Sequence, residues 1–393
     1  MVRHSCPIKS ILPETSSRGS ANQQRHMHIT YDYRIFSDQR HGGISRYFAE
    51  IAKIIPSLEG DNVEIFSPLY INEYIRRSPK VHVVGVKCPQ LRFSKLATKI
   101  INSSLGCIRN YTIRNTDIFH ETYYSRFSCA PRSVKRVVTV HDMIHEKFPA
   151  MFRSADKTSR DKQNAVLRAD HVICVSESTR RDLMDIIGVP IEKISVIHHG
   201  YTMGGYKNSA LPPAVKRPYI LYVGARGGYK NFERLLRMYS HSELRNEFSL
   251  VCFGGGNITP NESSLISSLN ITPDKIIFLS GSDSTLASLY TFAAVFVYPS
   301  LYEGFGIPLL ESMSFGCPVA CSNTSSMPEV VGNAAELFDP NDHNSMNMAL
   351  ERVLSSTKRS RELTDFGYER IKLFSWEKCA RQTLDVYKHV MRC

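Results

Sequence analysis

The stretch of residues 293–321 constrains the fold of this chain more than any other. A short apolar run at 295–298 ends at a proline, which is typical of a parallel strand covered on both faces. Gly304 and Gly306 follow, and because neither has a Cβ, backbone can approach a ligand closely there. Pro308 suits the first turn of a helix, where its missing N–H costs nothing. The stretch therefore predicts a strand, a tight loop, a helix and a second strand.

The start of this predicted helix favours an anionic ligand. Leu309 and Leu310 follow Pro308 in the first turn, and we expect their amides to point out of the helix start without an intrahelical partner. Two carboxylates bracket the turn, Glu303 before the helix and Glu311 within it. A glutamate in a helix usually lies on a solvated face, but this arrangement allows both carboxylates to face one cleft above the strand ends.

The whole pattern resembles the donor-sugar motif of the family 4 retaining glycosyltransferases, which have the GT-B fold. The resemblance rests on two acidic residues separated by Gly-Phe-Gly and an apolar run, on Tyr-Pro-Ser before them and on Gly-Cys-Pro-Val after them. It implies an α/β chain with two Rossmann-like domains that face each other across a cleft and close on a nucleotide-diphosphate sugar. It also implies that Glu311 holds the ribose hydroxyls and that Glu303 lies by the transferred sugar. Further donor-binding residues implied in this stretch are Gly304, Phe305, Gly306, Leu309 and Leu310.

A length of 393 residues is too great for one ordinary core and suits two domains. The resemblance extends over residues 27–393. Residues 1–26 are polar and lack the apolar core of a signal peptide, so we expect a disordered N-terminal extension, and Met27 is an alternative start. The expected parts that follow are an acceptor-binding domain (27–200), a linker (201–217), a nucleotide-sugar-binding domain (218–375) and a helix that returns to the first domain (376–393).

Two features of the first domain are predicted to face the donor. Gly42 and Gly43 open a predicted helix after the first strand, where a glycine pair permits close approach to a phosphate. The fingerprint Gly-x-Gly-x-x-Gly is absent, which argues against a dinucleotide redox cofactor. The resemblance places the glycine pair against the donor diphosphate, and the phrase Thr-Val-His-Asp places His141 beside the transferred sugar as an electrostatic or hydrogen-bonding group. We expect His120 and His145 to be structural.

The second domain supplies two cations. In the phrase Val-Gly-x-Arg-x-x-x-Lys-Asn, Arg226 and Lys230 follow a predicted strand and are expected to face the same cleft as Glu303. The phrase resembles the family's diphosphate-binding pair, and a departing diphosphate needs such charge in the transition state. The sequence shows no acidic pair spaced to hold a divalent ion near the diphosphate, so we expect neither an obligatory metal nor a cofactor.

The predicted activity is transfer of a hexose with retention of configuration, by a front-face displacement in which the acceptor hydroxyl passes its proton to the leaving phosphate oxygen. Mannose is favoured, with GDP-mannose as donor, from an overall similarity to bacterial surface-polysaccharide mannosyltransferases; UDP-sugars are the alternative donors. The acceptor is expected to be a glycan or a lipid-linked glycan. The rival predictions are a nucleotide-sugar epimerase or hydrolase on the same fold, and a non-catalytic nucleotide-sugar-binding scaffold at the membrane.

The net charge of +12 is concentrated in one segment. Residues 76–136 contain thirteen Lys or Arg and only two acidic residues, Asp117 and Glu121. Within this segment, apolar residues recur at helical spacing with cations around them. The apolar set is Phe93, Leu96, Ile100, Ile101, Leu105 and Ile108, and the cations are Arg92, Lys95, Lys99 and Arg109. Such a helix either lies on an anionic membrane leaflet or packs against the core with a solvated basic face; no nucleic-acid-binding module accompanies the charge.

Composition indicates a reducing compartment. The ten cysteines are scattered and form no metal-ligand pattern, and no apolar run approaches the roughly 20 residues that span a bilayer. We therefore expect a cytoplasmic protein. If the basic helix lies on a leaflet rather than against the core, the protein also contacts the inner face of the cell membrane peripherally through residues 76–136.

Overall fold

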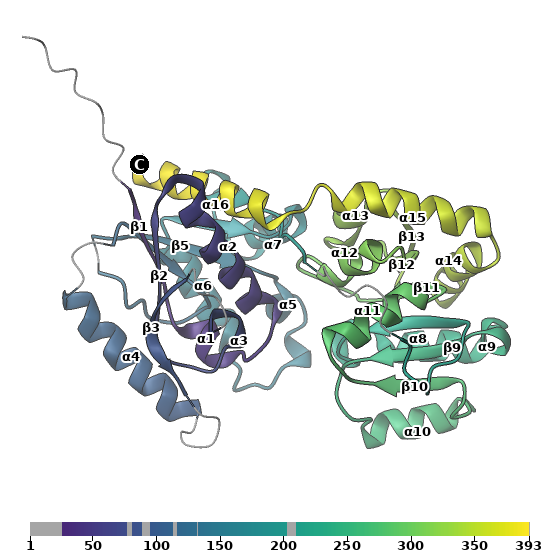
Figure 1. Cartoon of the computed structure of the whole chain (residues 1–393). Helices are drawn as coiled ribbons and strands as arrows, with labels where there is room; N and C mark the ends of the chain where they lie inside the picture. The colour runs from purple at the N-terminus through teal and green to yellow at the C-terminus, as the bar shows by residue number, and fades with distance from the viewer. Residues whose placement is uncertain are drawn as a thin grey trace, which may run out of the picture.

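The computed structural model describes residues 26–76, 81–88, 95–112, 116–131, 133–202 and 210–392. Figure 1 shows two α/β domains, with the chain crossing back from the second to the first before its last helix. The extension expected over residues 1–26 falls outside the described residues except for His26, and so does the linker segment 203–209.

The first domain is built on a parallel sheet of seven strands in the order β3-β2-β1-β4-β5-β6-β7. The strands are β1 (His28–Tyr31), β2 (Asn62–Tyr70), β3 (His82–Lys87), β4 (Ile118–Glu121), β5 (Lys135–Val140), β6 (His171–Cys174) and β7 (Ile194–Val196). The helices are α1 (Arg34–Asp38), α2 (Gly43–Glu59), α3 (Glu73–Arg76), α4 (Lys95–Thr112), α5 (Ile144–Lys147), α6 (Thr158–Arg168) and α7 (Glu177–Ile187), with the turns η1 (Pro149–Met151) and η2 (Ile191–Lys193). The strand order reverses between β1 and β4, which is the usual ligand-binding position in open α/β sheets.

The second domain has a parallel sheet of six strands in the order β10-β9-β8-β11-β12-β13. The strands are β8 (Tyr219–Val223), β9 (Ser249–Phe253), β10 (Ile276–Leu279), β11 (Val295–Tyr298), β12 (Val319–Ser322) and β13 (Ala335–Phe338). The helices are α8 (Phe232–His241), α9 (Leu244–Glu247), α10 (Pro260–Ser268), α11 (Asp283–Phe292), α12 (Ile307–Ser314), α13 (Met327–Val331), α14 (His343–Leu354) and α15 (Thr357–Ile371), with the turn η3 (Gly228–Lys230). Here the order reverses between β8 and β11, so the loops that carry Lys230 and Glu303 flank the reversal.

The strand, loop, helix and strand predicted for residues 293–321 are confirmed as β11, α12 and β12. All four residues of β11 are buried, as a strand in the middle of a covered sheet requires. Gly306 has a φ of +96°, a left-handed conformation that glycine adopts without steric cost, and it directly precedes α12. Pro308 occupies the first turn of the helix.

The last helix, α16 (Trp376–Arg392), packs against α2 of the first domain. It lies along the top of that domain in Figure 1, coloured yellow. The hydroxyl of Tyr387 lies 3.1 Å from the hydroxyl of Tyr31 and 2.6 Å from Nδ1 of His120, all three buried. Thr139 accepts or donates at the other ring nitrogen of His120, at 2.9 Å. His120 is therefore structural, as predicted, and α16 ties the end of the chain to the first domain.

Helix α4 turns a polar face to the sheet. Asn102 is fully buried, and its side-chain amide makes hydrogen bonds of 2.8 and 2.9 Å with the backbone N–H and C=O of Leu69, where the register of β2 and β3 shifts. Ile100 is 57% exposed and Leu105 is 43% exposed. The alternative in which these apolar residues face the core is therefore wrong for Ile100 and Leu105.

Part of that predicted amphipathic helix is not described. Phe93 and Arg92 lie outside the described residues, and the side chains of Lys95, Leu96, Ile108 and Arg109 are not described either. No helix in the described part of the chain combines the length and the apolar character needed to cross a bilayer.

Candidate active site

The two domains meet at the loop that carries Gly304. A Cβ added to Gly304 would lie 1.7 Å from the carbonyl oxygen of His141 and 3.0 Å from Cβ of Asp142. Only glycine fits so close to another backbone. His141 follows β5 and Glu303 precedes Gly304 after β11, so this contact brings together two site residues that the sequence predicted from different domains.

A salt bridge preorganises the second-domain side of the site. Nζ of Lys230 lies 2.6 Å from Oε1 of Glu303 and 3.3 Å from the hydroxyl of Tyr298. Glu303 is buried, and the amide N–H of Glu303 donates to Oγ of Ser325 at 2.9 Å. A cation and a carboxylate are thus fixed side by side at the carboxyl ends of β8 and β11, where the strand order reverses.

Glu311 lies where the glycine pair of the first domain approaches α12. A Cβ on Gly43 would lie 4.0 Å from Cδ1 of Ile307, the first residue of α12. Burial raises the pKa of Glu311 to about 7, although the nearby charge of Arg46 opposes this. Arg46 was not identified from the sequence, even though it stands one turn into the helix that Gly43 begins. A cation at that spacing after a glycine pair is the signal that would have found it.

The ring of His141 is buried at the end of β5. Burial lowers the pKa of His141 well below its ordinary value, and His199, His120 and Lys162 lower it further. Neither ring nitrogen has a hydrogen-bond partner among the described residues. The ring stacks on His199, with centroids 5.6 Å apart and an interplanar angle of 8°. Buried polar atoms are almost always paired in native proteins. Two unpaired ring nitrogens therefore indicate that a ligand hydroxyl can be their partner.

Comparison with known proteins identifies the family of this chain. The family described as "Glycosyl transferases group 1" matches residues 207–370, and "Glycosyltransferase Family 4" matches residues 41–203. The O-antigen chain mannosyltransferase B of Escherichia coli is 30% identical over 278 residues, which are 66% of this chain and 71% of that protein. This chain belongs to the family 4 glycosyltransferases. The O-antigen chain mannosyltransferase RfbU of Salmonella typhimurium is 29% identical over 260 residues, 66% of this glycosyltransferase and 67% of that one.

Solved structures share the fold of this glycosyltransferase. Sucrose-phosphate synthase from Thermosynechococcus elongatus matches with a TM-score of 0.72 and 20% identity, covering 94% of this chain and 100% of that one. Anabaena HepE, solved with UDP and glucose, matches with a TM-score of 0.70 and 15% identity, covering 93% and 100%. The predicted GT-B fold with two Rossmann-like domains is confirmed.

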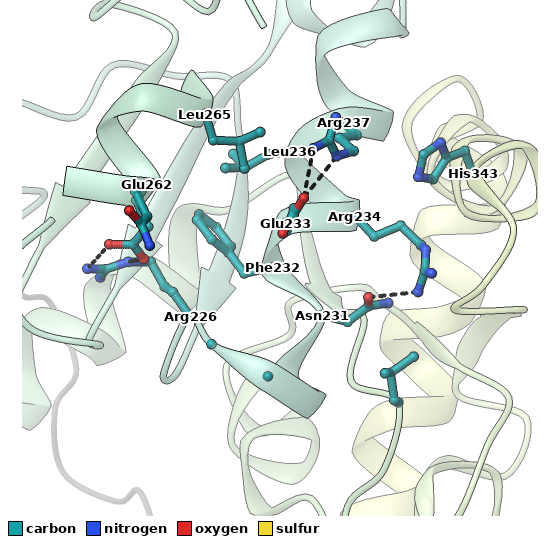
Figure 2. Close-up of a pocket in the computed structure, with 14 residues that line it drawn as sticks. Arg226, Asn231, Phe232, Glu233, Arg234, Leu236, Arg237, Glu262, Leu265 and His343 are labelled. Atoms are coloured by element: carbon teal, nitrogen blue, oxygen red, sulfur yellow. Dashed lines mark hydrogen bonds and ion pairs between the residues drawn. The ribbon is translucent and has the colours of Figure 1, made fainter. Parts of the chain in front are cut away.

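Arg226 of the glycosyltransferase lies in a network of its own. Nε of Arg226 lies 2.7 Å from Oε1 of Glu262, and the guanidinium also donates to the carbonyl oxygens of Gly254, Gly256 and Asn257 at 2.6, 3.1 and 2.9 Å. Figure 2 shows Arg226 pointing toward Glu262 on α10. Glu262 therefore already neutralises the charge of Arg226, and three carbonyls accept its hydrogen bonds. The predicted role of Arg226 in diphosphate binding stays a prediction.

A cavity of about 750 Å³ opens beside this network. Figure 2 shows its lining, which includes Arg226, Phe232, Arg234 and His343. Of the predicted site residues Arg226 lines this cavity, whereas Lys230, Glu303 and Glu311 do not.

One predicted donor-binding group differs from expectation. The amide N–H of Leu309 donates to the carbonyl of Gly306 at 3.0 Å, so the prediction that this amide is free is wrong. The left-handed Gly306 starts α12 with a tight turn, which brings its carbonyl within reach. The ring of Phe305 packs against His199 and Phe374, at centroid distances of 5.2 and 5.7 Å, and forms part of the contact between the domains.

Proposed function

We propose that this glycosyltransferase moves a hexose, mannose in first place, from a nucleotide-diphosphate sugar to a glycan or lipid-linked glycan with retention of configuration. The observation that carries the proposal is the close approach of Gly304 to the backbone carbonyl of His141, because Gly304 directly follows Glu303, which pairs with Lys230. Mannose and the donor GDP-mannose are favoured because two relatives with about two thirds coverage are named O-antigen chain mannosyltransferases. UDP-sugars are the alternative donors.

Lys230, Glu303, His141 and Glu311 each have a role in the proposed reaction. The acceptor hydroxyl oxygen bonds to the anomeric carbon as the bond from that carbon to the phosphate oxygen breaks, and the hydroxyl proton passes to that phosphate oxygen. Lys230 neutralises the diphosphate as its charge grows. Glu303 and His141 hold sugar hydroxyls, and Glu311 holds those of the ribose. Gly42 and Gly43 leave room for the diphosphate across the cleft.

We also propose that transfer needs no metal ion. Lys230 and the N-terminal end of α12 would supply the positive charge that a divalent ion supplies elsewhere. The described residues contain no group of three or more His, Cys, Asp or Glu side chains that could hold a metal. Activity should be the same with and without a chelator, and loss of activity on chelation would reject this part of the proposal.

The direct test is turnover of purified protein with GDP-mannose, UDP-glucose and UDP-N-acetylglucosamine, each with and without a glycan acceptor. Acceptor-dependent release of one nucleoside diphosphate supports the transferase and names the donor. Release without acceptor favours a hydrolase, and conversion of the sugar without release favours an epimerase. If no donor is consumed and none raises the melting temperature, the transferase proposal is rejected and the non-catalytic alternative is favoured.

A peripheral membrane contact through residues 76–136 is part of the proposal, because a lipid-linked acceptor lies at the membrane surface. It is supported by the exposure of Ile100 and Leu105 on α4, with the cation Lys99 beside them and also exposed. Apolar side chains flanked by cations bind anionic leaflets by burial and charge together. The corresponding location is the cytoplasmic face of the cell membrane.

Vesicle binding tests this contact. Ile100→Ser with Leu105→Ser should reduce sedimentation with vesicles that contain about 30% anionic phospholipid, because part of the affinity comes from apolar burial. Leu167→Ser is the matched control, since Leu167 is 60% exposed on α6. Equal binding by the double variant, the control and the original protein would reject the contact.

A further inference from the structure

We propose that Glu329 is a positioning residue for sugar transfer: its carboxylate latches the second domain onto the N-terminal end of α7 in the first, and so holds the Glu303 loop against His141. The catalytic part of this inference rests on the proposed function. The latch itself is a physical contact between the domains and has a readout that needs no substrate.

Both carboxylate oxygens of Glu329 reach from α13 into the first domain. The amide N–H of Glu177 donates to them at 2.9 and 3.0 Å, and the amide N–H of Ser178 donates to Oε2 at 3.3 Å. Nε2 of His198 lies 2.7 Å from Oε1. These amides have no acceptor within their own helix, because they lie in the first turn of an eleven-residue helix, where a carboxylate is favoured by hydrogen bonds and by the helix dipole.

The carboxylate of Glu329 is ionised in this contact. Burial alone would raise its pKa, but hydrogen bonds from His198 and from the amides of Glu177 and Ser178 outweigh burial and lower the pKa. Hydrogen bonds to an ionised acceptor are roughly twice as strong as those between neutral groups. A neutral side chain of the same shape would therefore hold the domains together less firmly.

The N-terminal end of α7 also contacts the Glu303 loop directly. The hydroxyl of Ser176, the N-cap residue of α7, lies 2.7 Å from the carbonyl oxygen of Gly304. The hydroxyl of Thr179 lies 3.3 Å from the same oxygen. One helix start thus meets the second domain twice, at Glu329 and at Gly304.

Within the second domain, a short segment joins Glu329 to the Glu303 loop. The Glu303 amide donates to Oγ of Ser325, and Oγ of Ser326 donates to the Glu303 carbonyl, both at 2.9 Å. Ser325 has a φ of +52°, a left-handed conformation that a serine holds only when its surroundings fix it. Arg370 on α15 donates to the Val330 carbonyl at 2.8 Å and so fixes α13. Only three or four positions of constrained backbone separate Glu329 from Ser326 and Ser325, which bond to Glu303. A shift of Glu329 should therefore also shift Glu303.

This arrangement predicts which kinetic constant depends on Glu329. The groups proposed to bind the donor most directly, Glu311 and Lys230, belong to the second domain, whereas His141 belongs to the first. Loosening the latch should leave donor affinity nearly unchanged and lower the rate of the transfer step, because the two halves of the site lose their alignment. A misplacement of about 1 Å is enough to cost a catalytic step on the order of 100-fold.

The experiment compares Glu329→Gln with Glu351→Gln, a surface glutamate of α14 whose side chain is bonded only locally to Asn347. We expect Glu329→Gln to lower kcat by roughly 10- to 100-fold with the dissociation constant for GDP-mannose, or for the donor that turns over, changed less than about threefold. His198→Gln should give a smaller loss, and the double variant should be no worse than Glu329→Gln, because both act through one contact. Small-angle scattering should show a larger radius of gyration for Glu329→Gln than for the control.

Each outcome decides the inference. An unchanged kcat together with an unchanged radius of gyration would overturn it, as would a loss of donor affinity equal to the loss of kcat. If Glu329→Gln does not fold, His198→Gln carries the same comparison. If the original protein turns over no donor, the proposed function fails, whereas scattering on the variants still decides whether Glu329 holds the domains together.

Discussion

Nζ of Lys230 lies 2.6 Å from Oε1 of Glu303, although the two residues are 73 positions apart in the chain. They meet because β8 and β11 are neighbours in the sheet and their following loops flank the point where the strand order reverses. Each side chain fixes the position of the other before a substrate arrives. Preorganised charge of this kind stabilises a transition state without reorganising at the moment of reaction.

Lys230→Ala should lower kcat/KM for transfer by roughly 100- to 1,000-fold, because the leaving diphosphate loses the cation that neutralises it. The melting temperature should fall modestly, since Glu303 is left partly buried without its partner. Initial rates and thermal denaturation of the same preparation measure both effects. Lys372→Ala is the control, because Lys372 is exposed and pairs only with Glu369. Activity near the original level in Lys230→Ala would remove Lys230 from the mechanism.

Arg226→Ala should destabilise the second domain, by about 3 kcal/mol, because it removes the cation that pairs with Glu262 and leaves three backbone carbonyls without their guanidinium donor. Denaturant unfolding monitored by fluorescence or circular dichroism measures the change. If Arg226 only binds the diphosphate, Arg226→Ala should lose transfer activity while its free energy of unfolding stays unchanged.

Glu262→Gln separates these two roles of Arg226. If the network is structural, removing the carboxylate charge lowers the free energy of unfolding as well, and the two substitutions are not additive because they share one contact. If Arg226 turns to the diphosphate when the donor binds, Glu262→Gln should not weaken donor binding, because Glu262 then no longer competes with the diphosphate for the guanidinium.

The sequence was informative where the signal is local. The strand, loop and helix around Gly306 follow from an apolar run, two glycines and a proline, all within about a dozen residues, and the structure has them at those positions. The placement of Lys230 and Glu303 at one edge also followed, because strand ends in a parallel sheet share that edge, although their salt bridge was not predicted.

The sequence was uninformative where the partner comes from distant backbone. Arg226 and Lys230 stand four positions apart, yet Arg226 is drawn to carbonyls presented by Gly254 and its neighbours, which have left-handed φ values. Glu329 meets the start of α7 about 150 positions away, through main-chain amides that leave no residue pattern to read. The amide of Leu309, expected to be free, donates to the carbonyl of Gly306, because the turn at Gly306 brings that carbonyl close.

Donor binding should depend on pH through Glu311. Burial raises the pKa of Glu311 to about 7, and ribose hydroxyls donate to the ionised carboxylate, so protonation opposes binding. The donor dissociation constant should therefore rise as the pH falls below about 7, approaching tenfold per pH unit. His141 stays neutral across this range, because its pKa is held well below its ordinary value.

Calorimetry with GDP-mannose between about pH 6 and pH 8 measures this dependence, because the diphosphate of a nucleotide sugar is esterified at both ends and does not titrate in this range. Glu311→Gln should bind the nucleotide more weakly and show no such slope. A slope that persists in Glu311→Gln would assign the titration to another group.

Gly304→Ala tests the contact between the domains without changing any charge. The added Cβ would lie 1.7 Å from the carbonyl oxygen of His141, a distance that no side chain rotation can relieve, so the two loops must move apart. Gly227→Ala is a matched control, because a Cβ at Gly227 meets nothing within 4 Å and its φ of −108° suits any residue. We expect Gly304→Ala to lose transfer by roughly 100-fold or more while it still binds the nucleoside diphosphate through the second domain. Gly227→Ala should keep both. If Gly304→Ala transfers sugar at the original rate, the reaction does not require His141 and the Glu303 loop to be in contact, and the site as described is not the one that turns over.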